Sequence, residues 1–266
     1  MRDFFSTMNK TAVIDHIVTW LRNCSEQSGT RGFVIGISGG IDSALTSTLC
    51  AMTGKPTLCL NMPIRQHAAE YNRGHEHMQW LVKKYPNTSI AEVELTGVFT
   101  KLEEALPTEI QDWLTMANSR ARLRMTTLYA FACHHKYLVA GTGNKVEDFG
   151  VGFFTKYGDG GVDLSPIADL MKSEVYALAQ ELGIVQSILT AKPTDGLWAD
   201  GRSDEDQIGA TYDELEWAMR FLEDPKDFSK LSSREEKVLD IYTRMNKANK
   251  HKMEAIPVCV IPEELK

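Results

Sequence analysis

The chain has 266 residues, of which 43% are hydrophobic and 24% charged, an ordinary composition for a globular protein with one large or two small domains. Its formal net charge of -7 argues against a general nucleic-acid binder, because such proteins gain affinity largely by neutralising phosphates. The chain contains no run of about 18 apolar residues, so we expect no membrane span.

The five cysteines (Cys24, Cys50, Cys59, Cys133 and Cys259) are scattered and form no Cys-x-x-Cys pair. This pattern fits neither a zinc site nor a disulfide framework, which favours a reducing compartment. Because Cys50, Cys59 and Cys133 lie in apolar runs, we expect them in the core. The N-terminus lacks the apolar segment of a signal peptide, and we therefore interpret the protein as cytoplasmic.

Helical and strand patterns alternate along the first half of the chain. Apolar residues at helical spacing predict helices, and short apolar or alternating runs predict strands. In chain order we predict a helix over 9–28, a strand over 33–38, a helix from the next loop to about Gly54, a strand over 57–62, a helix over 67–85, a strand over 89–95, a helix over 109–134 and a strand over 136–141.

This alternation predicts an α/β fold, a Rossmann-like parallel sheet with helices on both faces. Ligands of such folds bind outside the carboxyl ends of the strands. The loops at 36–43, 63–67 and 141–161 follow predicted strands, so we expect them to share one edge and to carry the chemistry.

The first of these loops is rich in glycine and serine. It consists of Gly36, Ile37, Ser38, Gly39, Gly40, Ile41, Asp42 and Ser43. Glycines let consecutive N–H groups point at one oxygen cluster, and the start of the next helix adds partial positive charge, so the loop predicts a phosphate site. A carboxylate beside a phosphate is repulsive unless a cation lies between them, and Asp42 therefore predicts bound Mg²⁺. The alternative is a strand-to-helix turn that merely needs glycine.

The loop lacks the Gly-Lys-Ser/Thr ending of kinases and GTPases. Its Ser-Gly-Gly-x-Asp-Ser pattern instead resembles the pyrophosphate loop of the N-type ATP pyrophosphatases, which cut ATP between the α and β phosphates.

The loop after the fourth predicted strand carries a second set of polar residues. Thr142 stands where a hydroxyl meets a nucleotide, and Glu147 or Asp148 offers a second carboxylate to the metal held by Asp42. The alternative for the two acids is a favourable interaction with a helix N-terminus.

Residues 152–163 form an unusual loop with four glycines, three aromatic residues, one lysine and two aspartates. Such a loop is costly to order and suits a planar ring and a charged substrate group. Lys172 follows in the first turn of a predicted helix, where a lysine opposes the helix dipole, so we expect an anionic partner for it.

The segment 194–210 is long, irregular and acidic. Loops of this length in compact domains are commonly lids or disordered. We predict a lid, and a disordered loop is the alternative. Thr211 with Glu214, and Ser232 with Glu235, predict the starts of two more helices, the second running towards Met253.

The glycine loop, Gly141-Thr142, the stretch from Gly152 to Gly161 and Asp163 together resemble the ammonia-dependent NAD synthetases over residues 10–255. The resemblance implies a two-step reaction. The nicotinate carboxylate of deamido-NAD attacks the α-phosphorus of ATP, which gives an adenylate and pyrophosphate. Ammonia then displaces AMP, which leaves NAD. Mg²⁺ would be the cofactor and ATP a co-substrate.

The resemblance also implies roles for individual residues. ATP contacts would come from Gly36 through Ser43 and from Thr142, Lys172 and Thr194. Mg²⁺ would be held by Asp42 and Glu147. Deamido-NAD contacts would come from Arg122, Lys156, Asp163, His251 and Lys252. The catalytic residues would be Asp42, Lys156 and Lys172.

Two departures from the family pattern affect these roles. One residue more than in many relatives lies between Glu147 and Gly152, which leaves Asp148 as a competitor for the metal. Asn61 occupies a position where many relatives have an adenine-binding arginine, and Arg65 is a candidate substitute.

Two other functions compete with this interpretation. They are another pyrophosphatase of this superfamily, such as a GMP-synthetase-like or tRNA-modifying enzyme, and a non-catalytic nucleotide-binding regulator. We expect one domain over residues 1–266 with no glutaminase domain, so free ammonia or a separate partner would supply nitrogen. The resemblance further implies a homodimer, and we expect neither nucleic-acid nor membrane partners.

Overall fold

The computed structural model describes residues 8–192, 204–224 and 231–266. Four parallel strands form one sheet in the order β3-β2-β1-β4. They are β1 (Gly32–Gly36), β2 (Thr57–Asn61), β3 (Thr88–Glu92) and β4 (Tyr137–Val139). The predicted α/β fold with a parallel sheet is confirmed, because each crossover between strands passes through helix.

Side chains of the central strands alternate between two apolar layers. Phe33 and Ile35 of β1 pack into one core cluster, whereas Val34 packs into the cluster on the opposite face. In β2, Cys59 packs into the same cluster as Phe33 and Ile35, and Leu58 packs into the cluster on the opposite face. This alternation is the two-residue period of a strand, and it places helices on both faces.

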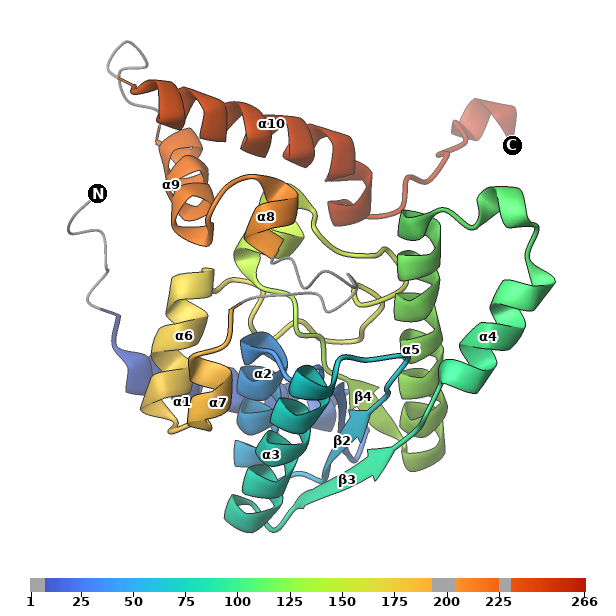
Figure 1. The fold of residues 1–266 in the computed structure, drawn as a ribbon, viewed down its shortest axis with the longest axis vertical. Coiled ribbons are helices and arrows are strands. Elements are labelled where there is room, and N and C mark those ends of the chain that lie inside the picture. Colours follow the sequence, from blue (N-terminus) through green and yellow to red (C-terminus); the bar gives the residue numbers. More distant parts are fainter. Residues whose placement is uncertain (1–7, 193–203, 225–230) are drawn as a thin grey trace.

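The helices of the two layers lie on opposite faces of the sheet (Figure 1). The first layer contains α1 (Lys10–Gln27), α2 (Ile41–Met52), α3 (Ala68–Lys84), α6 (Lys172–Glu181) and α7 (Gln186–Leu189). The second layer contains α4 (Thr96–Ala105) and α5 (Trp113–His135). The sequence did not predict α4.

The long helix begins later than predicted, at Trp113 instead of residue 109. Asp112 caps its N-terminus by accepting a hydrogen bond from the Thr115 N–H at 3.0 Å. A short 3₁₀ turn, η1 (Thr108–Ile110), occupies the segment before it. The side-chain cap at Asp112 therefore decides where the helix starts.

A third apolar cluster joins the C-terminal helices to the loop after β4. It contains residues of η2 (Val146–Val151), α8 (Asp204–Ile208), α9 (Tyr212–Glu223) and α10 (Ser233–Met253). Figure 1 shows α8, α9 and α10 together on one side of the molecule, away from β2, β3 and β4. The capping boxes predicted at Thr211 and Ser232 are confirmed. A 3₁₀ turn, η4 (Glu263–Leu265), lies near the C-terminus.

The cysteines agree with prediction except at one position. All five are free, and Cys50 and Cys59 are buried. Cys133 is exposed, so its predicted core position is wrong, because α5 turns this residue away from the sheet. Within the described residues, no helix has the length and apolar character that a membrane crossing requires.

Candidate active site

The glycine loop between β1 and α2 is closed by its own serines. The Ser38 N–H donates to Ser43 Oγ at 3.3 Å, and Ser43 Oγ donates to the Gly40 carbonyl at 3.0 Å. Gly39 has a φ of 84°, a left-handed conformation that favours glycine. Gly40 caps α2 without a side-chain hydrogen bond, so the first N–H groups of this helix are available to an anion.

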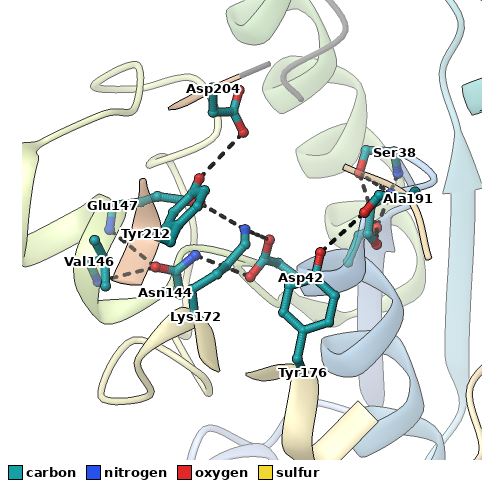
Figure 2. A network of polar contacts seen from close by, with 12 residues as sticks. Ser38, Asp42, Asn144, Val146, Glu147, Lys172, Tyr176, Ala191, Asp204 and Tyr212 are labelled. Atoms are coloured by element: carbon teal, nitrogen blue, oxygen red, sulfur yellow. Dashed lines mark hydrogen bonds and ion pairs between the residues drawn. The ribbon is translucent and has the colours of Figure 1, made fainter. Parts of the chain in front are cut away.

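A buried lysine joins the two carboxylates that were predicted to bind metal (Figure 2). Lys172, at the start of α6, is 4% exposed. Its Nζ lies 2.6 Å from Asp42 Oδ2 and 2.9 Å from Glu147 Oε1. Asn144 Nδ2 donates to the other oxygen of Asp42 at 3.1 Å. The anionic partners expected for Lys172 thus include two carboxylates of the protein itself.

Tyr212 completes this cluster from α9. Its hydroxyl donates to Glu147 Oε1 at 2.6 Å and lies 3.4 Å from Asp204 Oδ2 (Figure 2). The Nζ of Lys172 lies 4.7 Å from the centre of the Tyr212 ring, close enough for a cation–π interaction. Tyr212 therefore contacts both members of the Lys172–Glu147 pair.

One ammonium group balances only one of the two carboxylates. Burial by itself would lower the pKa of Lys172, but Asp42 and Glu147 outweigh it and raise the pKa well above its ordinary value. Burial opposes ionisation of Glu147 too, yet Lys172 and the Tyr212 hydroxyl hold the pKa of Glu147 below its ordinary value. For Asp42, burial and the Glu147 charge prevail and raise the pKa.

Further acids surround a cavity of about 90 Å³ beside this cluster. Asp148 and Asp159 line it together with Asp42 and Glu147. Burial, reinforced by the negative charges of Glu147, Asp159 and Asp42, raises the pKa of Asp148 to about 8. The cavity thus holds more carboxyl groups than Lys172 can neutralise. A bound divalent cation would favour the ionised forms of Asp42 and Asp148, whose pKa values burial raises.

Gly143 is required at the wall of this cavity, because a methyl group there would collide with the Asp148 carboxylate. Asp148 itself lies on η2, which is a π-helical turn. A π-helical turn holds one more residue than an α-helical turn, and such turns occur frequently at functional sites. A turn of this kind would accommodate the additional residue predicted between Glu147 and Gly152.

The described residues contain no group of three or more His, Cys, Asp or Glu side chains arranged around a common metal position. Mg²⁺ is commonly bound by one or two carboxylates together with substrate phosphates and water. Asp42 and Glu147, at the mouth of the glycine loop, match that donor set.

A larger cavity of about 750 Å³ adjoins the smaller one. The residues predicted from the family pattern that line it are Gly36, Ile37, Ser38, Gly39, Gly40, Asp42, Arg122, Thr142, Glu147, Lys156, Lys172, His251 and Lys252. Ser43 lines the smaller cavity, whereas Ile41 is buried in the core. The loops at 36–43 and 141–161, which were predicted to share one edge of the sheet, both contribute residues to the two cavities. Thr142 lines both of them.

The end of α10 holds the glycine-rich loop 152–163 in place. Lys156 Nζ donates to the His251 carbonyl at 2.6 Å, and the Lys156 carbonyl accepts from Arg122 at 3.3 Å. Lys252 Nζ donates to the carbonyls of Gly152 and Phe154, each at 2.8 Å. These basic side chains fix the loop that forms one wall of the larger cavity.

Three other residues considered from the sequence lie apart from this cavity or outside the described chain. Asp163 accepts hydrogen bonds from the Tyr129 hydroxyl at 3.0 Å and the Val139 N–H at 2.8 Å, and it does not line the cavity. Arg65 pairs with Glu103 on α4 and does not line it either. Thr194, and most of the predicted lid over 194–210, lie outside the described residues.

Sequence reasoning missed three residues of the site: Asn144, Asp159 and Tyr212. Asn144 stands in the polar loop after β4, so its position was a usable signal. Asp159 lies in the glycine-rich loop, where only its neighbours were singled out. Tyr212 follows the capping threonine of α9, and no local pattern connects it with Glu147, 65 residues away.

Comparisons with known proteins identify the family of this chain. Residues 13–256 match the family model described as NAD synthase. The NH(3)-dependent NAD(+) synthetase of Methanosarcina mazei is 37% identical over 252 residues, which are 92% of this chain and 96% of that protein. The corresponding synthetase of Syntrophomonas wolfei is 35% identical over 264 residues, 97% of this chain and 100% of that protein.

A solved structure, an NMN synthetase from Francisella tularensis, has a TM-score of 0.83 and 30% sequence identity. The match covers 96% of this chain and 99% of that one. The similarity therefore includes the sheet, the glycine loop and the C-terminal helices.

Proposed function

This chain belongs to the NAD synthase family and is an NH3-dependent NAD synthetase, a carbon–nitrogen ligase, and we propose that its two adjoining cavities are where ATP, deamido-NAD and ammonia react. A carboxylate is a poor acyl donor, whereas its adenylate has AMP as a good leaving group. The site must therefore neutralise a polyphosphate, position the nicotinate carboxylate and exclude water from the adenylate.

The glycine loop would hold the ATP phosphates. Its N–H groups and the uncapped start of α2 supply donors, and the Ser38 and Ser43 hydroxyls lie 3.1 Å apart at the same place. Thr142 lines both cavities and would contact the nucleotide. Lys172 remains protonated because its two carboxylate partners raise its pKa, so it offers a permanent positive charge to the departing pyrophosphate.

Mg²⁺ would be held by Asp42 and Glu147, with the Asp148 carboxyl group beside them. When bound, the ion would neutralise phosphate charge as it develops on the leaving group. Glu147 shares its Oε1 with Lys172 and Tyr212, so its orientation is set before any ion arrives.

Deamido-NAD would occupy the larger cavity. Arg122, Lys156, His251 and Lys252 line that cavity. Arg122, Lys156 and Lys252 would supply positive charge for its phosphates, and His251 a hydrogen-bonding ring. Asp163 would support the site indirectly, because its carboxylate accepts hydrogen bonds from the Val139 N–H of β4 and from the Tyr129 hydroxyl. Lys156, in the glycine-rich loop, would stabilise charge near the reacting carboxyl group.

The observation that carries this proposal is the meeting of the glycine loop with the buried Lys172–Asp42–Glu147 cluster at one cavity. A non-catalytic nucleotide binder would gain nothing from burying this charged cluster, which is costly to desolvate. The family match over residues 13–256 favours NAD synthesis over another pyrophosphatase activity.

A coupled assay tests the proposal. The protein, ATP, Mg²⁺, deamido-NAD and an ammonium salt are incubated, and NAD is detected with a dehydrogenase. We expect NAD to form only when every component is present, and with ammonium in preference to glutamine. Activity with glutamine alone, or none with ammonium, would contradict the proposed nitrogen source.

A second candidate substrate is nicotinate mononucleotide, because the similar Francisella structure is an NMN synthetase. The same adenylation and amidation would then give NMN. Parallel assays with the mononucleotide and with deamido-NAD, compared by kcat/KM, decide between them, and we expect deamido-NAD to be preferred.

We also propose a homodimer. Val98, Ile110 and Leu114 are exposed apolar side chains on the segment from α4 to the start of α5. Light scattering coupled to size-exclusion chromatography would give the mass of about two chains if the proposal is correct.

A further inference from the structure

Arg73 stands on α3 at the rim of the glycine loop. Its Nε donates to the Gly39 carbonyl at 3.3 Å, and the side chain lines the larger cavity. Gln66, just before α3, donates in a similar way to the Ser38 carbonyl at 3.2 Å. These side chains hold the carbonyls of Ser38 and Gly39 at the turn of the loop.

The backbone of α3 is fixed against the same loop. A methyl group on Gly39 would collide with the Glu70 carbonyl oxygen and approach the Gly74 nitrogen to 3.1 Å. This close packing requires glycine at position 39 and keeps Arg73 at a constant distance from the phosphate site.

Within residues 8–192, 204–224 and 231–266, no carboxylate lies within ion-pair distance of Arg73. Lys172, by contrast, pairs with Asp42 and Glu147. A guanidinium group has five N–H donors in a planar fork, of which the Gly39 carbonyl takes one. The others match the geometry of phosphate oxygens.

We propose that Arg73 binds the β- and γ-phosphates of ATP and the pyrophosphate that they become. This inference rests on the proposed function, in which the glycine loop holds those phosphates. Lys172 would act at the Asp42 end of the loop and Arg73 at the Gly39 end, so that the two cations flank the polyphosphate.

The test measures pyrophosphate binding directly. The affinity for inorganic pyrophosphate with Mg²⁺ is determined by calorimetry, and the inhibition constant of pyrophosphate and the KM for ATP are determined in the coupled assay. For Arg73→Gln we expect pyrophosphate to bind at least tenfold more weakly and the KM for ATP to rise similarly. The KM for deamido-NAD should stay within about twofold of the wild-type value, because a charge-assisted bond to phosphate alone is lost.

Arg22→Gln is the matched control. Arg22 also donates from Nε to a backbone carbonyl, that of Thr53, at 3.3 Å, but at the far end of α2. We expect it to bind pyrophosphate like the wild type. Arg73→Lys keeps the charge without the planar fork and should bind with intermediate affinity.

The outcomes separate this inference from the proposed function. If Arg73→Gln binds pyrophosphate as tightly as the wild type, the assignment of Arg73 is wrong while the enzyme remains an NAD synthetase. If the wild type neither binds pyrophosphate nor forms NAD, the proposed function itself fails. Should Arg73→Gln unfold, Arg73→Met is the second neutral variant, and wild-type affinity in that protein would overturn the assignment.

Discussion

At the scale of single residues, the active site holds more buried carboxyl groups than its one buried lysine can pair with. Asp42 and Glu147 share Lys172, and Asp148 adds a further acid beside them. Burial makes each unpaired carboxylate costly in the free protein. The same carboxyl groups prepare the site for a cation, which would favour their ionised forms, and for the phosphates that accompany it.

Asp42→Asn should separate activity from stability. We expect kcat/KM to fall by about 100-fold or more, because a metal ligand near the phosphates is lost. The raised pKa of Asp42 means that burial opposes its charge, so the neutral amide should leave the melting temperature unchanged or higher. Coupled kinetics and thermal denaturation measure the two effects.

Asp240→Asn, at an exposed position of α10, is the matched control and should change neither property. Full activity in Asp42→Asn would show that this carboxylate does not bind the metal.

Tyr212→Phe tests the positioning of Glu147. The variant keeps the ring beside Lys172 but removes a 2.6 Å hydrogen bond to a carboxylate. We expect kcat to fall about tenfold, and the free energy of unfolding to fall by about 2 kcal/mol, the usual range for a hydrogen bond to a charged group. Steady-state kinetics and urea denaturation provide the measurements.

Tyr242→Phe is the control for Tyr212, because Tyr242 is buried in the same apolar cluster but lines neither cavity. Equal losses of activity in the two variants would mean that Tyr212 acts only through packing.

At the scale of elements, α9 connects the C-terminal helices to the active site. Tyr212 and Glu216 stand four residues apart and so share one face of α9. Tyr212 contacts Glu147 on η2, whereas Glu216 receives hydrogen bonds from the Ser173 N–H at 2.8 Å and the Ser173 hydroxyl at 2.7 Å. Glu216 therefore caps α6 at the turn that carries Lys172.

Glu216→Ala should loosen the start of α6. Two donors of Ser173 lose a buried carboxylate, so we expect the free energy of unfolding to fall by about 2–3 kcal/mol. Activity should also fall, because Lys172 is the residue next to Ser173. Chemical denaturation and coupled kinetics measure these changes.

Glu235→Ala, which removes a half-buried capping carboxylate of α10, is the matched control. It should cost about 1 kcal/mol or less and leave kcat unchanged. Unchanged kinetics in Glu216→Ala would contradict the coupling between α9 and the site.

At the scale of the whole molecule, α2 and α3, two helices of the first layer, meet through a buried histidine. His77 of α3 is 0% exposed, and its Nε2 lies 2.9 Å from the Ser47 hydroxyl of α2. Its Nδ1 has no hydrogen-bond partner among the described residues. Burial lowers the pKa of His77 from 6.5 to about 3.

This histidine should make the fold sensitive to acid. The unfolded chain takes up a proton near pH 6.5, whereas folded His77 does so only near pH 3, so stability is lost progressively as the pH falls below about 6.5. By pH 5 the loss from this group amounts to about 2 kcal/mol. In His77→Gln, the free energy of unfolding should change less between pH 8 and pH 5.

Urea denaturation of both proteins at several pH values tests this expectation. At pH 8 the histidine is neutral in the folded and in the unfolded protein, so this pH provides the reference. Identical pH dependence in the wild type and His77→Gln would mean that His77 is not buried in its neutral form.

Much of the fold was predictable because it depends on local patterns. These patterns depend on interactions between residues that are close in the sequence. They include the alternation of strands and helices, the capping threonine of α9 and serine of α10, and the glycines of the phosphate loop. The α4 helix was missed, and the start of α5 was placed too early. Here a side-chain cap at Asp112, and not the apolar pattern, marks the boundary.

The sequence by itself determined the class of fold, the phosphate loop and, through the stretch from Gly152 to Asp163, the resemblance that identifies the substrate. Only the tertiary structure decided that Lys172 lies against Asp42, 130 residues away, and that Tyr212 contacts Glu147. Contacts at such separations depend on how the layers pack. The electrostatics depend on burial, which no local pattern records, and for this reason the charge balance of the site became visible only in three dimensions.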